Sequence, residues 1–140
     1  MMRIRVQIVD PEAPLYSGEA DAVFAPAELG EVGIMPRHAP LLTRLRAGEV
    51  RVRHDVGEES FFVTGGILEV QPFAVTVLAD RAVRSAELDE EEARRARQRA
   101  EERLAQKAAE LDIAHAEAEL AEAVARLRAI ERLRKIGVLK

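Results

Sequence analysis

The chain has 140 residues, 48% of them hydrophobic, with a formal net charge of −4 at pH 7 and no cysteine. This length suits one domain, or a small domain with an appendage, while the charge gives no support for nucleic-acid binding and the lack of cysteine excludes disulfides and thiolate metal sites. Since it has neither a basic-then-apolar leader nor an apolar run as long as a membrane span, we expect a soluble cytoplasmic protein.

Prolines and glycines divide the chain near Arg84. All six prolines and seven of the eight glycines precede that residue, whereas residues 85–136 contain neither type. Because both types mark turns and are costly inside helices, we expect turn-rich β structure in residues 1–84 and helix in residues 85–140. The two parts should be joined by a short hinge.

Several short segments of the first part have the pattern of strands. Residues 3–9 and 51–53 alternate polar and apolar side chains, and residues 61–63 and 74–79 are denser in apolar ones. Alternation indicates a half-buried strand, and apolar runs indicate a strand covered on both faces. Short strands separated by turn residues predict an antiparallel β-sandwich.

Two adjacent glycines, Gly65 and Gly66, stand between two of these segments. They could form a β-bulge or allow two backbones to approach closely. A phosphate-binding loop is the sharper alternative, but no lysine and no helix follow the glycines, which disfavours it.

The second part begins with signals of a helix start. Asp89 is a candidate N-cap, and Glu92 occupies the capping-box position three residues later. Small apolar side chains then recur every three or four residues, which predicts a narrow stripe against a partner helix. The stripe consists of Ala93, Ala96, Ala100, Leu104, Ala108 and Leu111.

A second helix is predicted after an interruption at residues 111–113, with Asp112 as its cap. Its apolar residues follow a strict heptad, Ile113, Ala116, Leu120, Ala123, Leu127 and Ile130. Stripes of this kind pack along another helix. The two helices should therefore form an antiparallel hairpin, marginally stable alone and able to exchange partners.

Cations crowd the end of this second helix: Arg126, Arg128, Arg132, Arg134 and Lys135, with Glu131 the one acid among them. They could be a solvated helix end whose positive charge offsets the helix dipole. Alternatively they form a basic tip that docks on an acidic protein surface, since five cations in ten residues exceed what the dipole requires.

No pattern of catalytic or metal-binding residues is present. The three histidines lack metal-ligand spacing. We expect His38 to brace a loop, His54 to be an exposed turn residue, and His115 to lie on the polar face of the hairpin. The serines have no Gly-x-Ser-x-Gly context. We therefore expect a protein that is not catalytic alone, with no metal site and no firmly bound cofactor.

Residues 30–80 carry motifs of a known family. Residues 30–43, GEVGIMPRHAPLLT, resemble the GELGI-x-P-x-HAPLLT signature of the epsilon subunit of bacterial F-type ATP synthase. Residues 65–72, GGILEVQP, and residues 75–80, VTVLAD, resemble two further segments of that family in the same order and spacing.

The resemblance implies a β-sandwich, residues 1–84, that binds the gamma subunit and the c-ring in the rotating central stalk of a proton-translocating ATP synthase. It also implies a regulatory hairpin, residues 85–140, that inhibits ATP hydrolysis when extended into the catalytic head. By similarity the c-ring and gamma interface includes Glu31, Met35, His38 and Leu42, with Glu31 and His38 in one loop. The cations of residues 126–135 match the part of the family that contacts the beta subunit of the catalytic head, which also contains alpha. The resemblance places the whole complex at the cytoplasmic face of a bacterial membrane.

One departure from the family concerns ATP sensing on the folded hairpin. Some members bind ATP through an I/L-D-x-x-R-A motif, but here residues 88–93 read LDEEEA, with Glu92 in place of the arginine. A carboxylate there removes a phosphate partner and adds repulsion. Leu88, Asp89 and Ala93 remain from the motif, and Arg95, Arg99 and Arg126 could supply other cations. We expect weak ATP binding or none, and keep an ATP-sensing subunit as the alternative function.

Overall fold

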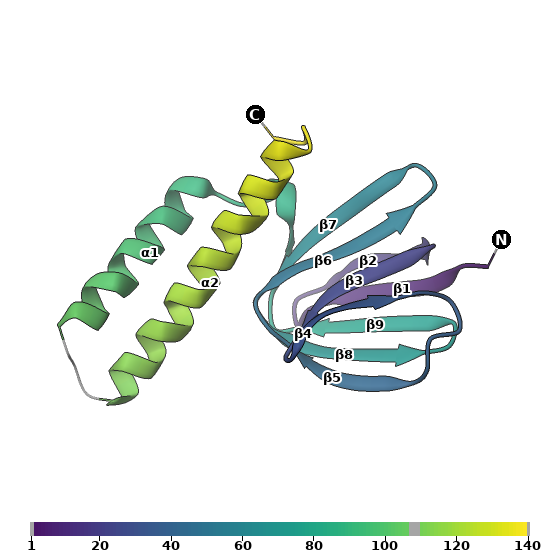
Figure 1. Cartoon of the computed structure of the whole chain (residues 1–140), viewed down its shortest axis with the longest axis horizontal. Coiled ribbons are helices and arrows are strands. Elements are labelled where there is room, and N and C mark those ends of the chain that lie inside the picture. The colour runs from purple at the N-terminus through teal and green to yellow at the C-terminus, as the bar shows by residue number, and fades with distance from the viewer. Residues whose placement is uncertain (1, 107–109, 140) are drawn as a thin grey trace. The chain divides into compact units, whose positions relative to one another are not determined.

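The chain forms two compact units, Met1–Ser85 and Ala86–Lys140 (Figure 1). This computed structural model describes residues 2–106 and 110–139, the side chains of residues 110 and 111 excepted. The strands are β1 (Ile4–Val9), β2 (Pro14–Ala20), β3 (Ala22–Ala27), β4 (Gly30–Ile34), β5 (Leu41–Leu45), β6 (Gly48–His54), β7 (Gly57–Val63), β8 (Gly66–Gln71), β9 (Ala74–Ala79) and β10 (Ala82–Arg84). A 3-10 turn η1 (Ser85–Glu87) leads to the helices α1 (Glu90–Ala105) and α2 (Glu110–Lys135).

The strands of the first unit follow one hydrogen-bonded path, β10-β7-β6-β3-β5-β8-β9-β1-β2, with β4 paired to β3. Every predicted strand segment is present, as β1, β6, β7 and β9. The expectation of a purely antiparallel arrangement is wrong at one place, because β1 and β9 pair in parallel. Parallel neighbours need a long connection, and here strands β2 to β8 lie between them.

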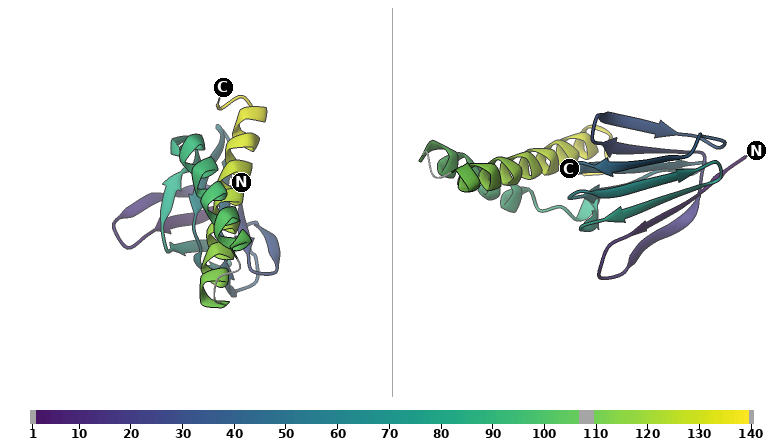
Figure 2. Two further views of the ribbon diagram at one scale, coloured as in Figure 1. Left: turned by 90° about the vertical axis from the view of Figure 1, so that its left-hand side faces the viewer. Right: turned by 90° about the horizontal axis from the view of Figure 1, so that it is seen from below.

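The buried core of this unit explains why the sheet folds over on itself. Alternation along β1 buries Ile4, Val6 and Ile8 completely. These side chains join one cluster with residues of β6 and β7, which lie far along the path from β1. The sheet therefore curves into two facing layers, the predicted β-sandwich (Figure 2).

Gly66 shows the close backbone approach that the glycine pair predicts. A Cβ atom at this position would lie 2.2 Å from the carbonyl oxygen of Leu78, and its φ of +137° is in a region that favours glycine. The β8–β9 register runs without a shift from Gly66 opposite Ala79 onward, so the alternative of a bulge is wrong here.

The second unit is the predicted antiparallel hairpin, and its first helix begins as expected. The Asp89 side chain accepts a hydrogen bond from the backbone N–H of Glu92 at 3.1 Å, as an N-cap should. Among the described side chains, two ion pairs join the antiparallel helices, Arg103 with Glu119 at 2.9 Å and Arg134 with Glu90 at 2.5 Å.

The position of the break between the helices differs from the prediction. The first helix ends at Ala105 and the second begins at Glu110, so Asp112 lies inside the first turn of α2 and is not its cap. Of the predicted first stripe, Ala108 lies outside the described residues and Leu111 belongs to α2. Residues 105–110 read AQKAAE, without glycine or proline, so no residue type marks the break.

The two stripes meet as predicted where side chains are described. Ala93 and Ala100 of α1 are buried, as are Ala116, Ala123 and Ile130 of α2. Ala129 and Leu133 are buried as well, although the heptad does not include them. Since most of the buried side chains of the hairpin are alanines, the contact is close but buries little apolar area.

Candidate interaction surfaces

A strip of apolar side chains lies on the outer face of the sandwich. Ile67 of β8 is opposite Leu78 of β9, which is opposite Val9 of β1. Ile67 and Leu78 are 43% and 48% exposed, whereas the next residues along, Leu68 and Val77, are fully buried. Leu42 of β5 is 70% exposed and lies opposite Glu69, two residues along β8 from Ile67. We call Val9, Leu42, Ile67 and Leu78 the outer strip.

A turn pinned to the same sheet carries two of the predicted interface residues, Met35 and His38. The His38 N–H donates to the Met35 carbonyl at 3.1 Å, and Arg37 between them has a φ of +72°. The Arg37 N–H donates to the Pro72 carbonyl, in the β8–β9 turn, at 2.6 Å. Met35 and Phe73 are both about half exposed, which leaves apolar side chains at this end of the unit.

His38 is a loop brace, as the sequence predicts. Its Nδ1 lies 2.6 Å from the carbonyl oxygen of Ala39. His54 is different from the expectation of an exposed turn residue. It ends strand β6, is only partly exposed, and its Nε2 lies 3.0 Å from a carboxylate oxygen of Glu59.

Glu31, the remaining predicted interface residue, lies on strand β4 and not in a loop with His38. Its carboxylate accepts a hydrogen bond from Arg51 of β6 at 2.6 Å. The Arg51 guanidinium also lies 4.7 Å from the centre of the Phe24 ring. Glu31 is therefore held in place by a cation that is itself stacked on an aromatic ring.

The five cations predicted to form a basic tip lie in three different surroundings within the second unit. Arg128, Arg132 and Lys135 line a groove of about 430 Å³ together with Val124, Leu127, Glu131 and Arg97. Arg126 pairs with Glu122 at 3.4 Å and lines another groove. Arg134 is paired with Glu90 across the hairpin. Only the first three therefore share one surface with an apolar floor.

The second groove, also of about 430 Å³, brings together some of the residues predicted for a weak ATP site. Arg99 of α1 and Arg126 of α2 line it, with Arg103 as a third cation. Glu92, Glu119 and Glu122 line the same groove, so its formal charge is balanced. This balance is consistent with weak binding of a polyanion.

The other residues predicted for that ATP site are engaged elsewhere in the second unit. Asp89 caps α1, and Ala93 is buried in the helix seam. Arg95 pairs with Glu91 at 3.7 Å, and Leu88 is partly buried. Of the residues predicted for an ATP site, the second groove therefore brings together only Arg99 and Arg126.

Sequence reasoning did not single out Ile67, Leu78 or Arg103. Strand β9 is apolar on both faces, which hides the alternation that would have separated Leu78 from the core. Arg103 follows Arg99 by four residues, one helical turn, and that spacing is the signal that could have found it.

The described part of the chain offers few other sites. No group of three or more His, Asp or Glu side chains within it could hold a metal ion. None of its helices is both long enough and apolar enough to cross a bilayer.

Comparisons with known proteins agree with this arrangement. Residues 3–85 match the family model of the ATP synthase delta/epsilon chain, beta-sandwich domain, and residues 86–131 match that of its long alpha-helix domain. The ATP synthase epsilon chain of Nitrosococcus oceani is 58% identical over 135 residues, which is 96% of each chain. That of Acidithiobacillus ferridurans is 51% identical over 139 residues, which is 99% of each chain.

Solved structures share the fold at low sequence identity. A chain of the Euglena gracilis mitochondrial ATP synthase, in a structure of OSCP, F1 and c-ring, has a TM-score of 0.84 and 20% identity, covering 93% of this chain and 82% of its own. A chain of the Tetrahymena thermophila mitochondrial ATP synthase central stalk and c-ring has a TM-score of 0.63 and 13% identity, covering 90% and 95%.

Together these matches define a two-part subunit, a β-sandwich followed by helices, and the chain belongs to the ATP synthase delta/epsilon chain family. The resemblance to the epsilon subunit of bacterial F-type ATP synthase is thereby confirmed, and with it the assignment to a non-catalytic subunit of that complex.

Proposed function

We propose that this chain is a central-stalk subunit of a proton-translocating ATP synthase, attached through its sandwich and restraining ATP hydrolysis through its helices. The partners would be the gamma subunit and the c-ring for the first unit, and the beta subunit, alongside alpha, for the second. It would work at the cytoplasmic face of a bacterial membrane as a peripheral part of the complex.

The outer strip is the main evidence that the sandwich attaches to other subunits. Its apolar side chains come from the strands β1, β5, β8 and β9 and lie on the outer face of the sheet. The residues that alternate with them along each strand point into the core. An exposed apolar patch bordered by polar residues marks a protein interface. The pinned turn with Met35 and His38 adjoins the β8–β9 turn, so we assign gamma to the strip and the c-ring to this turn.

A substitution in the strip tests the attachment. Leu78→Lys puts a charge into the proposed interface and should weaken binding to a gamma-containing catalytic head by about tenfold or more. Val56→Lys is the matched control, because Val56 is 91% exposed in the β6–β7 turn, away from the strip. Equal affinities of the two variants, measured by surface-immobilised binding, would refute the strip as the docking face.

The groove lined by Arg128, Arg132 and Lys135 supports the regulatory role. Its apolar floor of Val124 and Leu127 lies beside those cations, a combination that suits an acidic helix with an apolar face. The alternative function, ATP sensing, rests on the charge-balanced groove around Arg99 and Arg126, which favours it less.

A further inference from the structure

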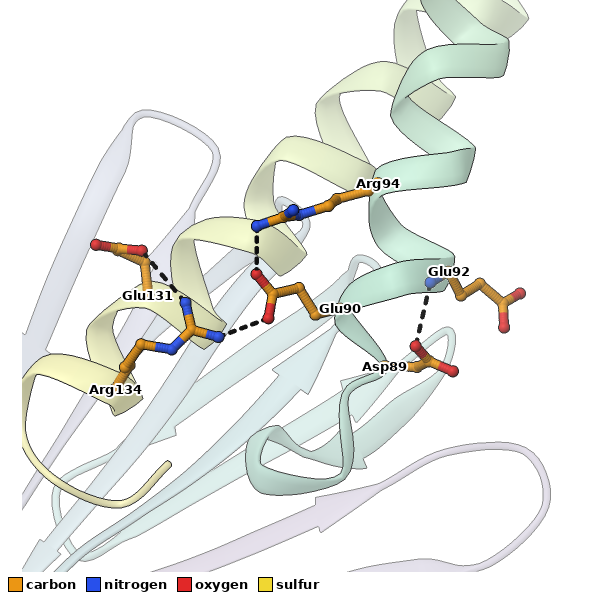
Figure 3. A network of polar contacts seen from close by, with 6 residues as sticks. All are labelled: Asp89, Glu90, Glu92, Arg94, Glu131 and Arg134. Carbon is orange, nitrogen blue, oxygen red and sulfur yellow. Dashed lines mark hydrogen bonds and ion pairs between the residues drawn. The ribbon is translucent and has the colours of Figure 1, made fainter. Parts of the chain in front are cut away.

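A shared carboxylate closes the free end of the hairpin, where α1 begins and α2 ends (Figure 3). One Glu90 oxygen accepts a hydrogen bond from Arg134 at 2.5 Å, and the other accepts one from Arg94 at 2.7 Å. Arg134 also lies 3.8 Å from Glu131 on its own helix. The pair of Glu90 and Arg134 joins residues 44 positions apart and is called the clasp below.

The clasp is better shielded from solvent than the ion pair of Arg103 and Glu119, which also joins the helices among the described residues. The Glu90 and Arg134 side chains are 29% and 38% exposed, against 41% and 52% for Arg103 and Glu119. The hydrogen bond from Arg134 is the main cause that holds the pKa of Glu90 below its ordinary value, with desolvation acting against it. Glu90 raises the pKa of Arg134 in return. The geometry therefore favours both charged forms.

Because of its location, the clasp should strongly affect whether the two helices stay together. Alanines supply most of the buried seam, so apolar burial contributes less than leucines in the same positions would. Arg103 and Glu119 lie toward the connection between the helices, where the chain itself limits their separation. At the opposite end, the described residues of the second unit hold α2 beside α1 through side-chain contacts, the clasp among them.

The geometry points to Glu90 as a built-in ligand of Arg134 that holds the free end of the hairpin closed and withholds this arginine from an acidic partner. The second half of this statement rests on the proposed function, because it assumes that the cations of α2 dock on the catalytic head. Glu90 and an external carboxylate compete for the same guanidinium, because its Nη2 already donates to Glu90 and its Nη1 already lies 3.8 Å from Glu131.

Closure can be measured directly on the full chain with two spin labels. Since the sequence has no cysteine, cysteines introduced at the exposed positions Gln98 and Ile136 label selectively. Glu90→Gln should broaden the distance distribution between the labels and move it to longer values. Glu91→Gln is the matched control, because it removes the same charge from the same helical turn but only a 3.7 Å contact with Arg95. A Glu90→Gln distribution that matches that of the control would overturn the proposal.

Competition is tested in the assembled catalytic head with the same full-length variants. Glu90→Gln should inhibit ATP hydrolysis at a roughly two- to fivefold lower concentration, since the ion pair it removes is partly exposed. Arg134→Gln should open the hairpin in the same way but weaken inhibition. Opening without stronger inhibition by Glu90→Gln, while the unmodified chain does inhibit, would contradict the competition.

Failure of the proposed function gives a different result. If the unmodified chain does not inhibit hydrolysis at all, the regulatory role is wrong. The distance measurement still decides closure in that case, because it is made on the chain alone.

Discussion

The carbonyl oxygen of Leu78 leaves no space for a side chain at Gly66. A Cβ atom there would be 2.2 Å away, and 2.8 Å from the Ala79 Cα. Both contacts are to backbone, so no side-chain rotation relieves them. The outer strip depends on this approach, because it sets β8 beside β9 and places Ile67 next to Leu78.

Gly66→Ala should therefore destabilise the protein more than an alanine at another glycine of positive φ. Gly57→Ala is the control, since Gly57 has a φ of +130° but no atom within 4 Å of the added Cβ. Both variants carry backbone strain, and Gly66→Ala adds overpacking of about 1–3 kcal/mol. Urea unfolding would show it as a lower midpoint, and equal midpoints for the two variants would contradict the close approach.

At the scale of single residues, Glu92 also distinguishes the two candidate functions of the hairpin, inhibition of ATP hydrolysis and ATP sensing. It is exposed and lines the groove that contains Arg99 and Arg126. The unmodified chain should bind ATP weakly or not at all at millimolar concentration. Glu92→Arg should strengthen binding by about tenfold, the value of a charged hydrogen bond. Glu91→Arg is the control, because it makes the same charge change one residue away from the groove lining.

Calorimetry of the unmodified chain decides between the alternatives. Micromolar affinity for ATP would mean that Arg99, Arg103 and Arg126 form a phosphate site despite the acids around them. Equal effects of Glu91→Arg and Glu92→Arg would indicate general charge attraction and no defined site.

Among the elements, the helical hairpin should respond to pH through the clasp. The pKa of Glu90 is lowered in the folded chain from its ordinary value of 4.5. Its contribution to stability is therefore complete above about that value, and is lost as the pH falls through the lowered pKa. The charged groups that face it are Arg134 and Glu131 on α2 and Arg94 on α1.

The difference in unfolding free energy between the unmodified chain and Glu90→Gln should thus be constant near neutral pH and disappear in acid. Asp10 and Glu59 also have lowered pKa values, but both chains contain them and their effects cancel. A difference that persists below the lowered pKa of Glu90 would contradict an ionic clasp.

The elements also show what the sequence could and could not predict. Local signals were sufficient for the Asp89 cap, the alanine seam and the strands β1, β6, β7 and β9. The parallel pairing of β1 with β9 depends on contacts between residues about 70 positions apart, which no local pattern encodes. The start of α2 was misplaced because Asp112 has the chemistry of a cap but lies inside a helix.

The candidate sites were predicted less completely than the fold. The resemblance supplied Met35, His38 and Leu42, and the structure places them on the pinned turn and the outer strip. It did not reveal that Arg51 already pairs with Glu31, or that Glu90 pairs with Arg134. Both pairs join distant segments, so only the folded chain brings their partners together.

Considered as a whole, the proposed function assigns attachment to one unit and regulation to the other. The first unit has its own core and an exposed apolar strip, whereas the second has a narrow seam, a clasp and a cationic groove. This division predicts that residues 1–85 alone fold and bind the gamma-containing head, and that removal of residues 86–140 leaves binding intact.

ATP hydrolysis by a head reconstituted with the full chain or with residues 1–85 tests this division most directly. Both forms should bind with similar affinity, but only the full chain should slow hydrolysis. Added salt should weaken that effect, because Arg128 and Lys135 of the groove are exposed to solvent. Equal hydrolysis rates with the two forms, each shown to be bound, would contradict the account.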